Sequence, residues 1–127
     1  MFALELDRRL KAARLSLIRV AVHPGYSATP LWLRATPWYM RTVLRLMNPL
    51  IAQSGEMGAL PTIYAATVAE LPGGSYVGPD GPGESRGYPS LVRPSRQAQS
   101  REAAARLWRV SEELTGVAYD LPEEAAA

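Results

Sequence analysis

The chain has 127 residues, 47% of them hydrophobic and 20% charged, which fits one folded domain and excludes a largely disordered polypeptide. It has no cysteine, and no apolar run approaches the roughly 18 residues of a membrane helix, so disulfides, thiolate chemistry and membrane spans are not expected. The net charge is only +2, with arginines scattered among acids, so nucleic acid is not an expected partner.

The first 14 residues have the pattern of an amphipathic helix. Phe2, Leu6 and Leu10 recur at four-residue spacing, and Asp7 falls on the opposite, solvent-facing side. No basic and then apolar stretch follows the initiator methionine, so a secretory signal is not expected and a cytoplasmic location is. Because the pattern begins without a capping residue, we expect that a preceding segment is missing.

Residues 15–22 (LSLIRVAV) are apolar and β-branched, which predicts a buried strand in a parallel sheet, packed by the first helix. His23-Pro24-Gly25 should end this strand, because Pro24 cannot donate to a ladder and Gly25 permits positive φ.

Further elements follow in alternation. Ser54 should cap a helix that runs to about Ala69, and Gly116 should end the last helix. Strands alternating with helices predict the α/β class, with residues 15–22 and 75–77 as neighbouring parallel strands. The remaining predicted elements are a helix from about Trp38 to Asn48, a strand at Ser75–Val77, a loop over 78–95 and a helix from Ser95 or Ser100 to Thr115.

The segment VHPGYSAT (22–29) is the strongest candidate for chemistry. A strand that ends in Pro-Gly at its carboxyl end lies where open α/β sheets bind ligands. An ordinary strand-terminating turn explains the same spacing, and the residues alone leave both interpretations open.

Five blocks, in order, resemble the C-terminal half of the short-chain dehydrogenases/reductases. The subgroup that they resemble is that of retinol dehydrogenases and protochlorophyllide reductases. The resemblance implies a partial Rossmann-type parallel sheet, the last two strands, with flanking helices over residues 1–117, followed by a flexible tail at 118–127. The blocks are MFALELDRRL, IRVAVHPGYSAT, QSGEMGALPTIYAAT, GGSYVGPDGPGESRGYP and RLWRVSEELTGV.

The resemblance also implies a site for NAD or NADP. Pro24 and Gly25 would shape the nicotinamide pocket, the main chain of Tyr26 and Ser27 would meet the carboxamide, and Thr29 would bind the carboxamide or a phosphate. The segment from Trp32 to Leu50 would form a substrate lid. Its candidate substrate contacts, for which core packing is the competing interpretation, are Trp32, Trp38, Tyr39 and Met40.

The family's other chemical groups are absent from the chain. Its Tyr-x-x-x-Lys pair exchanges a proton with the substrate oxygen, but here Asp7 stands four residues before Lys11, which is the only lysine. No Gly-rich turn of the dinucleotide-binding type precedes a helix. His23, Asp80 and Glu84 are better explained as structural or solvated residues than as a metal or acid–base site.

Two interpretations of function remain open. The chain is the C-terminal part of an oxidoreductase of this family that is inactive alone, or it is a non-catalytic remnant that associates with itself or with an intact relative. The second interpretation uses surfaces that commonly form subunit contacts in the family, namely the first helix and the last strand. Whether the chain is an enzyme, which substrate it takes and which dinucleotide it prefers are not decided by the sequence.

Overall fold

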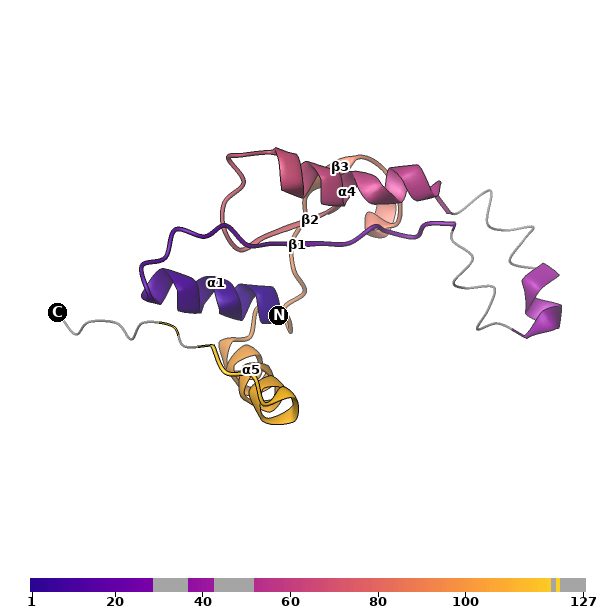
Figure 1. The fold of residues 1–127 in the computed structure, drawn as a ribbon. Coiled ribbons are helices and arrows are strands. Elements are labelled where there is room, and N and C mark those ends of the chain that lie inside the picture. Colours follow the sequence, from indigo (N-terminus) through magenta and orange to yellow (C-terminus); the bar gives the residue numbers. More distant parts are fainter. Residues whose placement is uncertain (29–36, 43–51, 120, 122–127) are drawn as a thin grey trace. The chain divides into compact units, whose positions relative to one another are not determined.

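The computed structural model describes residues 1–28, 37–42, 52–119 and 121 (Figure 1). Residues 38–42 are helical. The chain divides into two compact units, residues 1–21, 70–76 and 93–127 in the first and residues 22–69 and 77–92 in the second. The other elements are helices α1 (Phe2–Ala12), α4 (Gly55–Thr67) and α5 (Arg101–Thr115), a 3₁₀ turn η1 (Pro82–Glu84), and strands β1 (Val20–Val22), β2 (Ser75–Pro79) and β3 (Pro89–Leu91).

The strands form one mixed sheet in the order β1-β2-β3. The pair β1/β2 is parallel, as the sequence predicts, so the α/β class is confirmed. Strand β3 runs antiparallel to β2, with Val77 opposite Leu91 and Pro79 opposite Pro89. The prediction of a loop throughout 78–95 is therefore wrong. A Pro/Gly-rich composition predicts a loop. Proline is nevertheless tolerated at strand ends and sheet edges, and β3 is a short strand of this kind at the edge of the sheet.

Strand β1 is shorter than predicted, because only Val20–Val22 are in the ladder. The prediction that Leu17 and Ile18 are buried strand residues is wrong, since they are 59% and 61% exposed. A strand requires a partner along its whole length, and β1 lies at the end of the sheet order with β2 on one side. The apolar residues that precede β1 thus face solvent.

The caps predicted at Ser54 and Gly116 are confirmed, and of the two serines predicted as possible starts of the last helix the structure uses Ser100. Ser54 Oγ accepts a hydrogen bond of 3.2 Å from the Met57 amide at the start of α4. Ser100 Oγ accepts one of the same length from the Ala103 amide at the start of α5. Gly116 ends α5 in the left-handed region with φ 68°, the conformation that favours glycine after a helix.

The apolar core of the first unit is centred on Trp108, which is 1% exposed. The Phe2 ring stacks on it at 4.7 Å between centroids, and the Arg9 guanidinium lies 4.5 Å from its ring centroid. The indole Nε1 donates to Glu112 Oε1 at 2.7 Å, so the buried polar atom is satisfied. Phe2 therefore packs on α5, whereas the sequence predicted that the first helix, which carries Phe2, packs on the first strand. Leu114, near the end of α5, is exposed.

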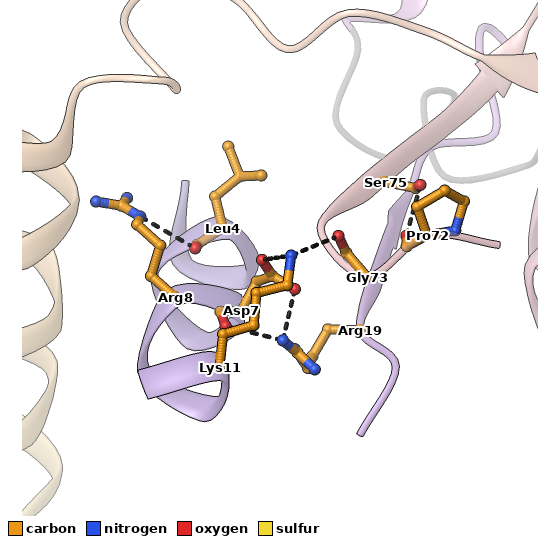
Figure 2. A network of polar contacts seen from close by, with 8 residues as sticks. All are labelled: Leu4, Asp7, Arg8, Lys11, Arg19, Pro72, Gly73 and Ser75. Carbon is orange, nitrogen blue, oxygen red and sulfur yellow. Dashed lines mark hydrogen bonds and ion pairs between the residues drawn. The ribbon is translucent and has the colours of Figure 1, made fainter. Parts of the chain in front are cut away.

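Asp7 is buried, and its predicted position on a solvent-facing side is wrong. Arg19 Nη2 donates to Asp7 Oδ1 at 2.5 Å and to the Asp7 carbonyl oxygen at 2.8 Å, and the side chains of both residues are 9% exposed (Figure 2). Lys11 Nζ lies 2.8 Å from Asp7 Oδ2 and donates to the Gly73 carbonyl oxygen at 3.4 Å. The hydrophobicity pattern of the helix cannot predict that Asp7 is buried, because its partner, Arg19, lies outside the helix.

The turn before β2 fits closely around this carboxylate. The Gly74 amide donates to the Arg19 carbonyl oxygen at 2.8 Å. A Cβ at Gly73 would lie 2.8 Å from Asp7 Oδ1, and Gly74 has φ +86°. Both positions therefore require glycine, one for space and one for backbone conformation. The Asp7–Arg19 pair joins α1, the segment before β1 and the turn before β2.

Replacing Asp7 should strongly destabilise the first unit. Asp7→Asn leaves the Arg19 guanidinium buried without its counter-charge, and losing one partner of a buried pair costs about 3–5 kcal/mol. Lys11→Ala is the matched control, because Lys11 contacts the same carboxylate from a side chain that is 62% exposed and its loss should cost about 0–1 kcal/mol. The rate of limited proteolysis at low temperature measures the destabilisation of each variant. Equal rates for the two variants would contradict the assigned importance of the Arg19 contact.

The isolated chain should associate or form a loosely packed state rather than a stable monomer. Leu17 and Ile18 expose apolar surface beside β1, and an unprotected strand edge promotes association. Fully burying one such side chain is worth about 1.5–3 kcal/mol, a large part of a typical stability of about 5–15 kcal/mol. Sedimentation and dye binding test this expectation. A monomer with a sharp thermal transition and no dye binding would contradict it.

Candidate functional site

The candidate site is the turn that follows β1 in the second unit. The His23 amide donates to the Val77 carbonyl oxygen at 3.0 Å and continues the pairing with β2. The chain then turns at Gly25, which has φ +63°. A Cβ there would lie 2.4 Å from the Ser85 carbonyl oxygen and 2.8 Å from Pro79 Cγ. The Pro24-Gly25 motif therefore forms a tight turn whose second residue must be glycine, as the sequence predicts.

After the turn, Ser27 forms an isolated parallel bridge with Gln53. The Gln53 amide donates to the Tyr26 carbonyl oxygen at 3.0 Å, and the Ala28 amide donates to the Gln53 carbonyl oxygen at 2.8 Å. In this pattern the amide and carbonyl of Ser27 point away from Gln53, and nothing in the described part of the chain bonds to them. One donor and one acceptor of the main chain are thus left for a ligand.

The main chain of Tyr26 is arranged differently. Its amide donates to the Ser85 carbonyl oxygen at 2.6 Å, and its carbonyl accepts the Gln53 amide. Of the two residues predicted to meet a carboxamide through main-chain groups, Tyr26 already has protein partners for both groups and Ser27 does not. The structure therefore favours Ser27 as the residue with free hydrogen-bonding capacity.

Gln53 fixes the position of the turn, and sequence reasoning missed it. Its side chain is buried, with Nε2 donating to the Pro24 carbonyl oxygen at 2.7 Å and Oε1 accepting the Gly87 amide at 3.0 Å. Ser27 Oγ donates to the same Pro24 oxygen at 3.0 Å. A Cβ at Gly58 of α4 would lie 2.1 Å from Ser27 Oγ, so the helix can approach only because glycine stands there. A lone glutamine before a helix cap carries no pattern that predicts these contacts.

His23 has a carboxylate partner that the sequence did not indicate. Its Nε2 lies 3.1 Å from Glu84 Oε2, and its Nδ1 accepts the Gly25 amide at 3.3 Å. A Cβ at Gly78 would lie 2.0 Å from His23 Nε2, so the ring packs directly on the backbone of β2. His23 is a structural residue, as predicted, but Glu84 is not merely solvated.

The other acidic candidate, Asp80, shapes the hairpin between β2 and β3. Its Oδ1 accepts the Tyr88 amide at 2.8 Å, and its own amide donates to the Tyr88 carbonyl oxygen at 2.9 Å. No cluster of three or more acidic or imidazole side chains suited to a metal occurs among the described residues. Through its two hydrogen bonds with Tyr88, Asp80 stabilises the turn of the hairpin.

The predicted lid is described in part. Thr29 and Trp32 lie outside the described residues. Trp38, Tyr39 and Met40 fall in the helical segment 38–42, and all three are exposed, Trp38 by 80%. Core packing, the competing interpretation for these three, is therefore wrong, and their role as substrate contacts stays a prediction.

A separate cavity of about 240 Å³ lies in the first unit beside the Phe2–Trp108 stack. Its wall is largely aromatic and aliphatic, and the one carboxylate in it, that of Glu112, accepts the Trp108 indole N–H. It contains none of the residues predicted to bind a cofactor or substrate. No helix among the described residues is long and apolar enough to cross a membrane.

Known proteins resemble the chain over almost its whole length. No family model matches it. It is 34% identical over 118 residues to human WW domain-containing oxidoreductase, a match that covers 90% of this chain and 25% of the relative. It is 30% identical over 118 residues to short chain dehydrogenase/reductase dpmpH of Macrophomina phaseolina, covering 88% of this chain and 52% of the relative.

A solved structure resembles the chain in its fold. The crystal structure of an uncharacterized protein from Mycobacterium paratuberculosis aligns with 95% of this chain at a TM-score of 0.63 and 36% identity, using 36% of that protein. The chain therefore has distant homologues among the short-chain dehydrogenases/reductases. It spans between a quarter and about half of the length of these curated relatives.

Replacing Gly25 should disrupt the turn. Gly25→Ala places a side chain in the left-handed region, at about 1–2 kcal/mol, and against the Ser85 carbonyl oxygen. Since about 1.4 kcal/mol corresponds to a tenfold change in an equilibrium, we expect proteolysis within 22–28 to accelerate about tenfold or more. Gly55→Ala is the control, because nothing lies within 4 Å of a Cβ there. A Gly25→Ala chain as resistant as wild type would show that the turn is not fixed as described.

Proposed function

We propose that the chain is the C-terminal, nicotinamide-binding part of an oxidoreductase of the short-chain dehydrogenase/reductase family, and that it is inactive alone. The observation that carries this proposal is the turn after β1, which leaves the amide and carbonyl of Ser27 without a described protein partner. A primary carboxamide both donates and accepts hydrogen bonds, so it complements this pair. The homology to oxidoreductases supports the same assignment.

The cofactor in this proposal is NAD or NADP, which supplies hydride transfer when it is bound. The residues of the turn suit the nicotinamide end of such a cofactor, because the Ser27 amide and carbonyl have no partner among the described residues and can pair with a carboxamide. Pro24 and Gly25 would form the pocket wall, Ser27 would hold the carboxamide, and Thr29 would bind it or a phosphate. The exposed side chains of Trp38, Tyr39 and Met40, together with Trp32, are the proposed substrate contacts.

The chain's own residues do not complete the reaction. A proton donor of the Tyr-x-x-x-Lys type is missing from the sequence, and Asp7, four residues before Lys11, is engaged with Arg19 in a buried ion pair. No Gly-rich turn of the dinucleotide-binding type, which leads into a helix and holds the pyrophosphate there, occurs in the sequence. In this proposal, additional polypeptide supplies these groups.

The second candidate function is association without catalysis. The exposed Leu17 and Ile18 beside the terminal strand β1 favour it, because such an edge accepts another strand. In this alternative the chain pairs with a second copy or with an intact relative. Co-expression with an intact relative distinguishes the two functions, since only the association function predicts that solubility is rescued.

The purified chain should show no dehydrogenase activity. It lacks a proton donor and most contacts for a dinucleotide, so neither binding nor chemistry is complete. The assay combines NAD, NADP and their reduced forms with alcohols, aldehydes and ketones, with heat-denatured chain as the control. Turnover that co-purifies with the chain would refute this expectation. An in-frame Tyr-x-x-x-Lys encoded immediately upstream of Met1 would support the catalytic proposal over the association function.

A further inference from the structure

Two consecutive residues of the loop around η1 hold the turn after β1 from both sides of Gly25. The Glu84 carboxylate contacts the His23 ring, with 3.1 Å between Oε2 and Nε2. The Ser85 carbonyl oxygen accepts the Tyr26 amide at 2.6 Å. His23, two residues before Gly25, and Tyr26, one residue after it, are therefore both bonded to the dipeptide Glu84-Ser85.

The ring of His23 connects Glu84 to the backbone of the turn. Its Nδ1 accepts the Gly25 amide at 3.3 Å, which requires Nδ1 to carry no proton. In the neutral ring the proton then lies on Nε2, where it is donated to the Glu84 carboxylate. A carboxylate on one ring nitrogen fixes the tautomer and so the acceptor on the other nitrogen. Glu84 thereby controls whether His23 can accept the Gly25 amide.

The backbone around this pair is adapted to it. The His23 ring occupies the space that a side chain at position 78 would need, since a Cβ at Gly78 would lie 2.0 Å from Nε2. Glu84 has φ 55°, a conformation that residues other than glycine rarely adopt. Such outliers persist where the surrounding contacts hold them, and they concentrate at functional sites.

From these contacts we infer that His23 and Glu84 are positioning residues for the nicotinamide turn. Neither residue contacts the cofactor in this inference. Glu84 fixes the tautomer of His23, His23 holds the Gly25 amide, and the turn then directs the free main-chain groups of Ser27. The inference rests on the proposed function, because it names residues that prepare the proposed carboxamide site.

The test uses the full chain with ¹⁵N-labelled histidine and glycine, under conditions in which the nitrogen spectrum shows the neutral form of the ring. Nitrogen spectra are recorded in solution, or by magic-angle spinning on sedimented material if the chain associates. His23, the only histidine, should carry its proton on Nε2. Glu84→Ala should give a mixture of tautomers and shift the Gly25 amide signal. Glu84→Gln should preserve both signals, because its amide oxygen still accepts from Nε2–H.

The matched control is Glu113→Ala, which removes an exposed carboxylate from α5 in the other unit and should change neither signal. A proton on Nδ1 of His23, or a Gly25 amide that ignores Glu84→Ala, would overturn the inference.

A second measurement, saturation transfer from the chain to nicotinamide mononucleotide, separates this inference from the proposed function. Transfer should occur with the wild-type chain and be lost with Glu84→Ala. Retained transfer in that variant would overturn the inference. No transfer to the wild-type chain, together with the expected tautomer, would refute the nicotinamide role and leave the control of the turn by Glu84 intact.

Discussion

The buried ion pair between Asp7 and Arg19 is the interaction on which the first unit depends. The Asp7 carboxylate binds Arg19, in the segment leading into β1, and Lys11 of α1 (Figure 2). The glycine turn before β2 is bonded to the same residues, since Lys11 donates to the Gly73 carbonyl oxygen and the Gly74 amide donates to the Arg19 carbonyl oxygen. Two charges out of water stabilise a fold only when their geometry and remaining hydrogen bonds are good. The second bond to the Asp7 carbonyl and the additional contact with Lys11 meet this requirement for the carboxylate. The Arg19 Nε, in contrast, has no described partner.

In the second unit, hydrogen bonds between uncharged groups hold the turn after β1 in place, beside the contact of His23 with the Glu84 carboxylate. Gln53 links the Pro24 carbonyl to the Gly87 amide, and Ser85 accepts the Tyr26 amide. These bonds hold a turn whose own backbone conformation is accessible to few residues. Because the bonding groups come from three separate stretches of sequence, the turn that carries the proposed site is specified by the fold of the whole unit, not by the Pro-Gly motif alone.

Local features of this protein could be predicted from sequence, and contacts between distant residues could not. The caps at Ser54 and Gly116 depend on neighbouring residues, so residue type was sufficient to place them, whereas it left Ser95 and Ser100 as alternative starts of α5. The bonds of His23 to Glu84 and of Gln53 to Pro24 join positions 61 and 29 residues apart, and no local pattern signals them. The length of β1 was overestimated for a related reason, because an apolar, β-branched run becomes a strand only where a neighbouring strand is present.

The enclosure of Trp108 has an optical consequence. An indole that is 1% exposed, stacked on Phe2 and covered by the Arg9 guanidinium is shielded from dissolved quenchers, whereas the indole of Trp38 is 80% exposed. The two chromophores therefore report on different events, one on the closure of α1 against α5 and the other on its local surroundings in segment 38–42. Once Trp32, the third tryptophan of the chain, is replaced, fluorescence can follow the assembly of the aromatic core around Trp108 separately from changes around Trp38.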